Sequence, residues 1–214
     1  HPPLVLSVYG HDVFQVPRKS MFHRDWIIRN LQHAAAIGST SEVMRRRVLD
    51  DLLPGADVTV TPFGVDLEDF NPARFPARPP GAPPVIGTAR ALKPKYGIDT
   101  LIRAVGLLHR EGRTTLKLEI VGSGSGRSRY ERLARRENLG GHVTFHGDVP
   151  HHRIPEKLSG FDVFAAPSRF DGESFGVAVI EASAMEKPVV VSRIGGLPEV
   201  VEEGVTGLIC PKED

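Results

Sequence analysis

The sequence predicts an α/β fold made of doubly wound parallel sheets, and three observations support this prediction. From residue 84 onward, short apolar strands alternate with amphipathic helices, which favours a parallel sheet covered on both faces. A shorter set of strand and helix patterns precedes a proline-rich stretch at residues 72–84. Polar, glycine-containing loops follow several strands, at the position where open α/β sheets bind their ligands.

The first 72 residues contain short strand patterns separated by two helix patterns. Each expected strand is an apolar or β-branched run bounded by polar residues. The strands are expected at 4–9, 35–38 and 57–61, and the helices at 18–36 and 42–53. The second helix begins behind a Ser-Thr-Ser-Glu sequence that is typical of a helix cap.

The second part of the chain is more regular. Its strands are expected at 84–88, 116–121, 143–145, 163–166, 189–192 and 208–210. Its helices are expected at 98–110, 127–138, 153–160, from Phe175 onward, and at 197–203. We therefore place a partial first domain at residues 1–72, a proline-rich linker at 73–84 and a second domain at 85–214. Because the chain begins at His1 without an initiator methionine, we interpret it as a fragment.

Composition excludes several classes of protein. Twenty-seven basic and 26 acidic side chains give a net charge of +1, which offers no footprint for nucleic acid. The single cysteine, Cys210, cannot form an intramolecular disulfide or a Cys-x-x-Cys metal site. No apolar run is long enough to span a membrane, so we expect a soluble, cytoplasmic protein. The helix at 18–36 mixes basic and bulky apolar residues. It either packs on a sheet or binds peripherally to the inner face of an anionic membrane.

The stretch at residues 168–182 organises the chain. It reads Ser-Arg-Phe-Asp-Gly-Glu-Ser-Phe-Gly-Val-Ala-Val-Ile-Glu-Ala, a polar loop that turns into an amphipathic helix. If the whole span is helical, Glu173 and Glu181 lie about 12 Å apart along the axis. The paired carboxylates of a hydrolase lie within about 5 to 10 Å of each other. We therefore interpret these two glutamates as contacts for the two ends of one long ligand.

A phosphate-binding region is expected between the two glutamates. The backbone N–H groups of Phe175, Gly176 and Val177, next to Ser174, are expected at the positive end of the helix. A molecule with hydroxyls at both ends and a diphosphate between them is a nucleotide sugar.

These residues resemble the retaining glycosyltransferases of family four, which have the two-Rossmann GT-B fold. The resemblance rests on Glu-x7-Glu within Ser-Arg-x3-Glu-Ser-Phe-Gly, on Lys-Pro-Val-Val-Val-Ser at 187–192 and on Gly-Gly-Leu-Pro-Glu-Val-Val at 195–201. It implies that Glu173 contacts the hydroxyls of the donor sugar and Glu181 the ribose. It also implies a truncated protein, with the end of the N-terminal domain and most of the donor-binding domain.

The resemblance extends to loops after other strands of the second domain. Arg90 and Lys95 match an arginine and a lysine that stabilise the leaving diphosphate in the family. Gly122 and Gly124 resemble its nucleotide-facing turn, although a plain strand-to-helix turn explains them equally well. Val149 belongs to a loop in which relatives hold the base through backbone groups.

His11 and Asp12 follow the first expected strand, in a loop similar to one that lines the acceptor side of the cleft in the family. Here Tyr9 stands where many members carry a histidine, so no catalytic role is transferred to His11. The alternative is that these two residues only shape the loop and cap the next segment.

The leading hypothesis is a retaining transfer of a hexosyl or N-acetylhexosaminyl group from a nucleoside-diphosphate sugar, with UDP-sugars favoured. The acceptor is a hydroxyl on a sugar or a lipid-linked sugar. No cofactor and no metal are expected, and His151 and His152 are interpreted as a solvated loop pair. The alternative is a nucleotide-sugar-binding module without its own activity, or a chain that completes its cleft as a homodimer. A further alternative, a nicotinamide-dependent oxidoreductase, is supported only by the glycine turn at Gly122 and Gly124.

Overall fold

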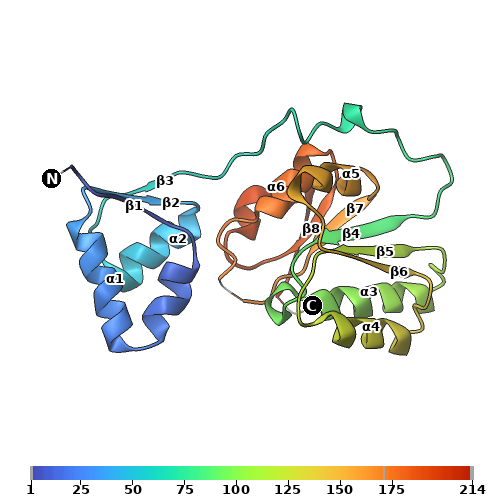
Figure 1. The fold of residues 1–214 in the computed structure, drawn as a ribbon, viewed down its shortest axis with the longest axis horizontal. Coiled ribbons are helices and arrows are strands. Elements are labelled where there is room, and N and C mark those ends of the chain that lie inside the picture. The colour runs from blue at the N-terminus through green and yellow to red at the C-terminus, as the bar shows by residue number, and fades with distance from the viewer. Residues whose placement is uncertain (1, 171, 213–214) are drawn as a thin grey trace. The chain divides into compact units, whose positions relative to one another are not determined.

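The computed structural model describes residues 2–170 and 172–212, which form two compact units (Figure 1). The first unit comprises His1–Gly64, Phe170–Gly176 and Ile194–Val200. The second comprises Val65–Arg169, Val177–Arg193 and Val201–Asp214. Each unit has its own parallel sheet, and the predicted domain limits at 72 and 85 stay predictions.

The first unit contains a three-stranded parallel sheet of order β1-β2-β3. The strands are β1 (Val5–Val8), β2 (Ala36–Ser39) and β3 (Val58–Val60). The helices are α1 (Met21–His33) and α2 (Glu42–Arg47), with short helical turns at His11–Gln15, Val16–Arg18 and Val48–Leu52. The core between sheet and helices is apolar and includes the fully buried Val13, Met44 and Val48.

Both helices of the first unit are shorter than expected, for local reasons. Helix α1 begins only at Met21 because Ser20 is extended and its hydroxyl accepts a hydrogen bond from the N–H of His23. It ends at His33, where Ala34 returns to the extended conformation that leads into β2. Helix α2 ends as an α-helix at Arg47 and continues as the π-helical turn Val48–Leu52.

The N-terminus of α2 has two caps. The hydroxyl of Ser41 accepts from the N–H of Met44 over 3.4 Å, as the Ser-Thr-Ser-Glu sequence predicts. The carboxylate of Glu199 accepts from the N–H groups of Glu42 and Val43 over 2.7 and 2.8 Å. A negative charge at this end of a helix is favourable, and the contact explains why the segment Ile194–Val200 belongs to the first unit.

The second unit contains a six-stranded sheet of order β6-β5-β4-β7-β8-β9, in which every neighbouring pair is parallel. The strands are β4 (Val85–Ala89), β5 (Lys117–Val121), β6 (Val143–Gly147), β7 (Val163–Ala166), β8 (Val189–Ser192) and β9 (Gly207–Cys210). This is the doubly wound Rossmann order, and the order of the strands reverses between β4 and β7. The prediction of a doubly wound parallel sheet is therefore confirmed.

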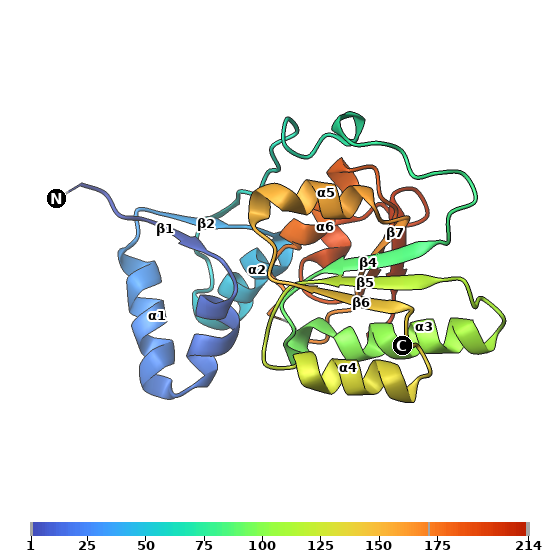
Figure 2. The ribbon, with the colours of Figure 1, turned by 45° about the vertical axis from the view of Figure 1, so that its right-hand side comes forward.

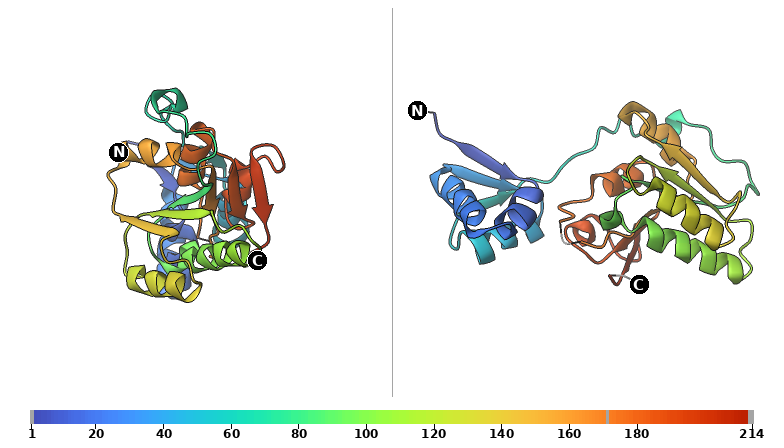
Figure 3. Two further views of the ribbon diagram at one scale, coloured as in Figure 1. Left: turned by 90° about the vertical axis from the view of Figure 1, so that its right-hand side faces the viewer. Right: turned by 60° about the horizontal axis from the view of Figure 1, so that its bottom comes forward.

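Helices cover both faces of this sheet. They are α3 (Ile98–Arg110), α4 (Arg127–Arg136), α5 (Ile154–Ser159) and α6 (Val177–Ala184). Helices α3 and α4 lie on one face and α5 and α6 on the other, as Figures 1 and 2 show. Figure 3 shows α3 and α4 side by side. The core under these two helices includes Ile102, Leu118, Ile120 and Tyr130, all at most 1% exposed.

One helix of the second part was predicted wrongly. Instead of a helix over 197–203 there is a single 3-10 turn, Leu197–Val200. The chain must turn directly into β9, because the N–H groups of Val205 and Thr206 donate to the carbonyl of Glu202. Within the residues that the structure describes, no helix is both long and apolar enough to cross a membrane.

Candidate functional site

A hollow of about 250 Å³ opens at the carboxyl ends of β4, β5 and β6 in the second unit. Ligands of open α/β sheets bind at this position, beside the point where the strand order reverses. Four residues predicted for the site meet there although they come from four different segments. These residues are Arg90, Gly122, Val149 and Glu181.

The two predicted cations share one aromatic ring. The guanidinium carbon of Arg90 lies 5.1 Å from the ring centroid of Tyr96, and Nζ of Lys95 lies 4.6 Å from the same centroid. Lys95 is half-buried, whereas its neighbour Lys93 is exposed. The structure thus distinguishes Lys95 from Lys93, and it places Lys95 against the same ring as Arg90, which lines the hollow.

The glycine turn after β5 is required by backbone packing. At Gly122, φ is +133° and a Cβ atom would lie 2.1 Å from the carbonyl oxygen of Arg90. At Gly124 a Cβ would lie 2.8 Å from the carbonyl oxygen of Leu92, whose N–H bonds the carbonyl of Ser123. A plain packing reason therefore explains both glycines, so the glycine turn is not by itself evidence for a nicotinamide cofactor. Their contact with a nucleotide stays a prediction.

Glu181 has a partner that sequence reasoning missed. Its Oε1 lies 2.8 Å from Nε2 of His151, and only 9% of the Glu181 side chain is exposed. The interpretation of His151 and His152 as a solvated pair was incomplete, because His151 is exposed and also bonds a buried carboxylate in the hollow. His152 is exposed, as expected.

The helix that carries Glu181 begins later than predicted. Helix α6 starts at Val177, because Gly176 has φ of +102° and cannot be helical. Phe175 and Gly176 therefore precede the helix, and its first N–H groups are those of Val177 and the residues after it. Since Glu173 lies outside α6, the separation of about 12 Å along a common axis does not apply.

Glu173 belongs to the first unit, together with Ser174, Phe175 and Gly176. Two glycines of the Gly-Gly-Leu-Pro-Glu sequence, Gly195 and Gly196, allow a close approach to the loop that carries Glu173. A Cβ at Gly195 would lie 2.0 Å from the carbonyl oxygen of Glu173, and the N–H of Gly196 donates to that oxygen over 2.9 Å. These glycines fix the backbone that presents the Glu173 side chain.

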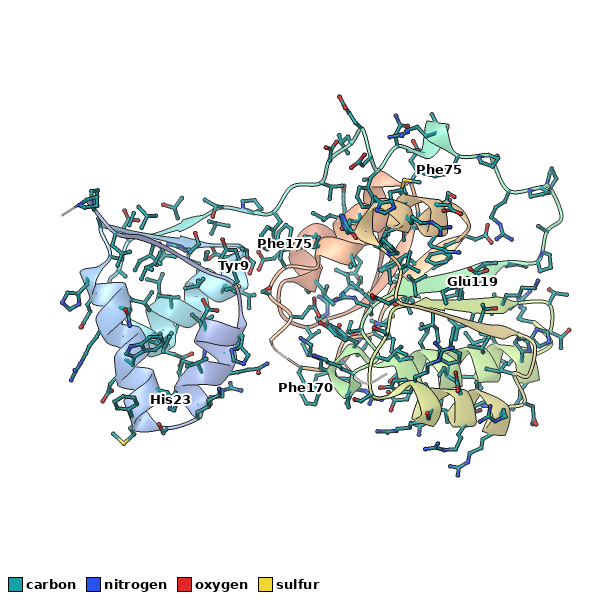
Figure 4. All side chains as sticks on the ribbon, in the orientation of Figure 1. Tyr9, His23, Phe75, Glu119, Phe170 and Phe175 are labelled. Atoms are coloured by element: carbon teal, nitrogen blue, oxygen red, sulfur yellow. The ribbon has the colours of Figure 1, made fainter. Side chains whose placement is uncertain are left out.

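Three aromatic rings pack in sequence within the first unit. Tyr9 stacks on Phe63 with 5.7 Å between ring centroids, and Phe63 meets Phe175 edge to face at 5.8 Å. Figure 4 labels Tyr9 and Phe175, the first and last of these rings. Phe175 is thereby held by side-chain packing, immediately before α6.

The other predicted residues of the first unit have distinct surroundings. Oδ1 of Asp12 accepts from the N–H of Gly10 over 2.7 Å, and Oδ2 from the N–H of Tyr9 over 3.1 Å. Asp12 thus shapes the turn after β1, as one of the two alternatives predicted, while His11 is exposed. Both begin a π-helical turn and not an open loop.

A larger hollow of about 580 Å³ lies elsewhere in the second unit, where no predicted site residue lines it. Lys187, at its wall, donates to the carbonyl oxygen of Ser159 over 3.1 Å, and burial lowers the pKa of this lysine. Among the described residues no group of three or more His, Cys, Asp or Glu side chains could hold a metal ion.

Comparison with known proteins gives one family. A family model described as glycosyl transferases group 1 matches residues 69–214. A GDP-mannose-dependent α-(1-6)-phosphatidylinositol monomannoside mannosyltransferase from Mycolicibacterium smegmatis is 34% identical, over 99% of this chain and 57% of the relative. A D-inositol 3-phosphate glycosyltransferase from Nocardia farcinica is 36% identical, over 81% of this chain and 40% of the relative. The chain thus spans about half the length of these relatives.

Solved structures agree on the fold. Anabaena HepE in complex with UDP and glucose superposes with a TM-score of 0.79 at 23% identity, over 99% of this chain and 58% of that one. Sucrose-phosphate synthase from Thermosynechococcus elongatus gives a TM-score of 0.81 at 24% identity, over 98% and 55%. These similarities confirm the predicted GT-B type of α/β fold.

Proposed function

Because the chain belongs to the group 1 glycosyl transferases, we propose that it moves a hexosyl or N-acetylhexosaminyl group from a nucleoside-diphosphate sugar to an acceptor hydroxyl. The observation that carries this proposal is the hollow beside the reversal of the strand order, which Arg90 and the buried Glu181 both line, while Lys95 lies against the same Tyr96 ring as Arg90. A nucleotide sugar has a diphosphate for the cations and a ribose for the carboxylate.

Arg90 and Lys95 stabilise the diphosphate in this proposal. Negative charge grows on the bridging oxygen as the bond to the sugar breaks, so fixed positive groups lower the barrier. The guanidinium can bond two phosphate oxygens at once, and the ammonium adds a second charge. The N–H groups around Val177, at the start of α6, add further donors for phosphate oxygens.

Two glutamates bind the ends of the donor. Glu181 accepts from the hydroxyls of the ribose, since an ionised carboxylate offers about four lone-pair directions. Glu173 accepts from hydroxyls of the transferred sugar and orients its anomeric carbon. Ser174, Phe175 and Gly176 contribute to the same loop, and Gly122, Gly124 and Val149 line the side that takes the base.

The transfer retains the anomeric configuration. The bond from the anomeric carbon to the phosphate oxygen breaks, and the acceptor oxygen attacks from the same face. The proton of the acceptor hydroxyl passes to the departing diphosphate, so no protein nucleophile is assigned. The two cations supply the positive charge, and the reaction uses no metal and no cofactor.

The donor base is uridine by preference, with guanosine as the rival, since one relative is named for GDP-mannose. The acceptor is a sugar or a lipid-linked sugar, and His11 and Asp12 are proposed as its contacts. We place the protein in the cytoplasm, in peripheral contact with the inner face of the membrane. The exposed side chains of Met21, Phe22 and Trp26 on α1 support this contact. Self-association as a homodimer belongs to the same proposal.

A second candidate is a nucleotide-sugar-binding module without independent transfer. It is favoured by the observation that the hollow lined by Arg90 and Glu181 lies wholly within the second unit. The two candidates share the donor site and differ only in turnover.

The test is calorimetric titration with UDP, GDP and ADP and then with the matching sugars, while sugar release and transfer are followed in parallel. Binding with turnover supports the transferase, and binding without turnover supports the module. Glu181→Ala should weaken donor binding, whereas Glu173→Ala should mainly lower turnover. Unchanged binding and activity in both variants, or no binding of any nucleotide to the unmodified chain, would show that the assignment is wrong. Light scattering at several concentrations tests the homodimer, and flotation with anionic vesicles tests the membrane contact.

A further inference from the structure

Glu181 is bound by a side chain that the proposed function does not use. The distance from its Oε1 to Nε2 of His151 is 2.8 Å. Because an ionised carboxylate only accepts, Nε2 of His151 carries the hydrogen of this bond. The carboxylate is 9% exposed and the imidazole 74% exposed, so the histidine reaches from the surface to a buried acceptor.

The imidazole of His151 is itself held in place. Its ring centroid lies 5.6 Å from that of Phe70, a side chain only 4% exposed. The backbone around it is fixed as a 3-10 turn, His151–Arg153, in which the N–H of Arg153 donates to the carbonyl of Pro150. His151 therefore bonds Glu181 from a position that Phe70 and the turn support.

A carboxylate that must accept from two ribose hydroxyls needs a fixed plane. Glu181 has three rotatable bonds, and a single hydrogen bond to one oxygen restricts the last of them. One bond from His151 also leaves acceptor capacity, because a carboxylate has about four lone-pair sites. Residues that orient a ligand-binding group in this way contribute to affinity without touching the ligand.

Resting on the proposed function, we propose that His151 is a positioning residue that orients Glu181 for the ribose of the donor. Phe70 supports it, so the segment Val65–Phe70 acts on the donor site through two side-chain contacts. The proposal makes His151 a determinant of the preference for ribose over sugars that lack its hydroxyls.

The test compares three variants in calorimetric titrations with UDP or GDP, whichever binds the unmodified chain. His151→Leu removes the hydrogen-bond donor to Glu181. His151→Gln keeps an N–H at nearly the position of Nε2, and His152→Leu is the matched control on the neighbouring residue. We expect about a tenfold weaker affinity for His151→Leu, most of the affinity for His151→Gln and no change for His152→Leu. Thermal unfolding of each variant checks that the fold is intact.

The same titrations with the 2′,3′-dideoxy nucleotide show whether the loss depends on the ribose. We expect the dideoxy ligand to bind the unmodified chain and His151→Leu equally. Unchanged or tighter binding of UDP or GDP to His151→Leu, an equal loss with the dideoxy ligand, or equal losses in the Leu and Gln variants would each overturn the proposal. Phe70→Leu should weaken the affinity for UDP or GDP by a smaller factor than His151→Leu does. An unchanged affinity in Phe70→Leu would show that Phe70 does not support His151.

Failure of the proposed function gives a different result. If Glu181→Gln binds the ribose and dideoxy ligands like the unmodified chain, the ribose assignment itself fails. If Glu181→Gln loses affinity for the ribose ligand and His151→Leu does not, only the role of His151 fails.

Discussion

Arg169 donates from Nη1 to Oδ2 of Asp99 over 3.0 Å, and this ion pair joins the loop after β7 to the start of α3. Nη2 of Arg169 also donates to Oγ1 of Thr100. The backbone N–H of Arg169 donates to the carbonyl of Lys95. One arginine thus connects the loop before Glu173 with the turn that carries a predicted phosphate-binding lysine.

We predict that Arg169→Met lowers the free energy of unfolding of the chain by about 3 kcal/mol, because it leaves the carboxylate of Asp99 with little compensation. That side chain is only 5% exposed, and its other cation, Arg129, lies farther away at 3.5 Å. Urea unfolding measures the change. The double variant Arg169→Met/Asp99→Leu should lose less than the sum of the two single variants.

The matched control is Arg153→Met, which breaks an ion pair with Glu156 whose side chains are 54% and 51% exposed. Such a surface pair contributes at most about 1 kcal/mol. Equal losses in Arg169→Met and Arg153→Met would contradict the role given to the buried pair.

We predict that Gly122→Ala is far more destabilising than Gly112→Ala. Both glycines have positive φ, +133° and +92°, so alanine is strained at either position. A Cβ at Gly112 meets nothing within 4 Å, whereas one at Gly122 would lie 2.1 Å from the carbonyl oxygen of Arg90. We expect about 1 kcal/mol for Gly112→Ala and about 3 kcal/mol or more for Gly122→Ala.

Thermal and urea unfolding of the two variants make the comparison. If they were equally stable, the packing reason for the glycine turn would be wrong. Because Gly122→Ala also shifts the backbone of Arg90, it should weaken binding of UDP or GDP, and Gly112→Ala should not.

The strands of the second unit were predictable because each is a short apolar run closed by a polar or glycine-containing loop. Helix positions were less predictable where one backbone angle decides the boundary. The apolar spacing of Val179 and Ala182 correctly indicated the buried side of α6, since both side chains are fully buried. It could not indicate that Gly176 takes a positive φ and delays the helix to Val177.

The partner of Glu181 was beyond reach of the sequence for a different reason. His151 lies thirty residues earlier in the chain, and the contact exists only because α6 and the loop after β6 meet at the same edge of the sheet. Nothing in the sequence of the pair His151 and His152 indicates which of the two bonds Glu181. Likewise, the contact that distinguishes Lys95 from Lys93 depends on the position of the Tyr96 ring, which Arg90 and Lys95 share in the folded chain.

We predict that Lys95→Met lowers the turnover number about a hundredfold, if the proposed transfer takes place, because a fixed charge that meets the leaving diphosphate is lost. Lys93→Met is the matched control, since it removes the same charge from an exposed position two residues away. Steady-state kinetics with the donor that binds tightest provide the measurement. Similar losses in both variants would mean that the net charge of the loop, and not the position of Lys95, matters.

We predict that Tyr130 ionises last of the three tyrosines when the folded chain is titrated with alkali. Burial raises the pKa of Tyr130 above its ordinary value of 10.0, and the charge of Asp99 acts in the same direction. The side chain is 1% exposed, whereas that of Tyr9 is 56% exposed. Tyr130→Phe should therefore remove the last step of the rise in absorbance at the tyrosinate band.

The raised pKa also sets the sign of an alkaline effect on stability. Between pH 10 and the pKa of the folded state, the folded chain binds one more proton at Tyr130 than the unfolded chain. The free energy of unfolding therefore falls as the pH rises through this range, while the contribution is fully present below pH 10. Urea unfolding at pH 9 and at pH 11 should show a smaller fall for Tyr130→Phe than for the unmodified chain, and Tyr9→Phe should leave the fall unchanged. An equal fall in all three proteins would show that other groups cause the loss of stability between pH 9 and pH 11.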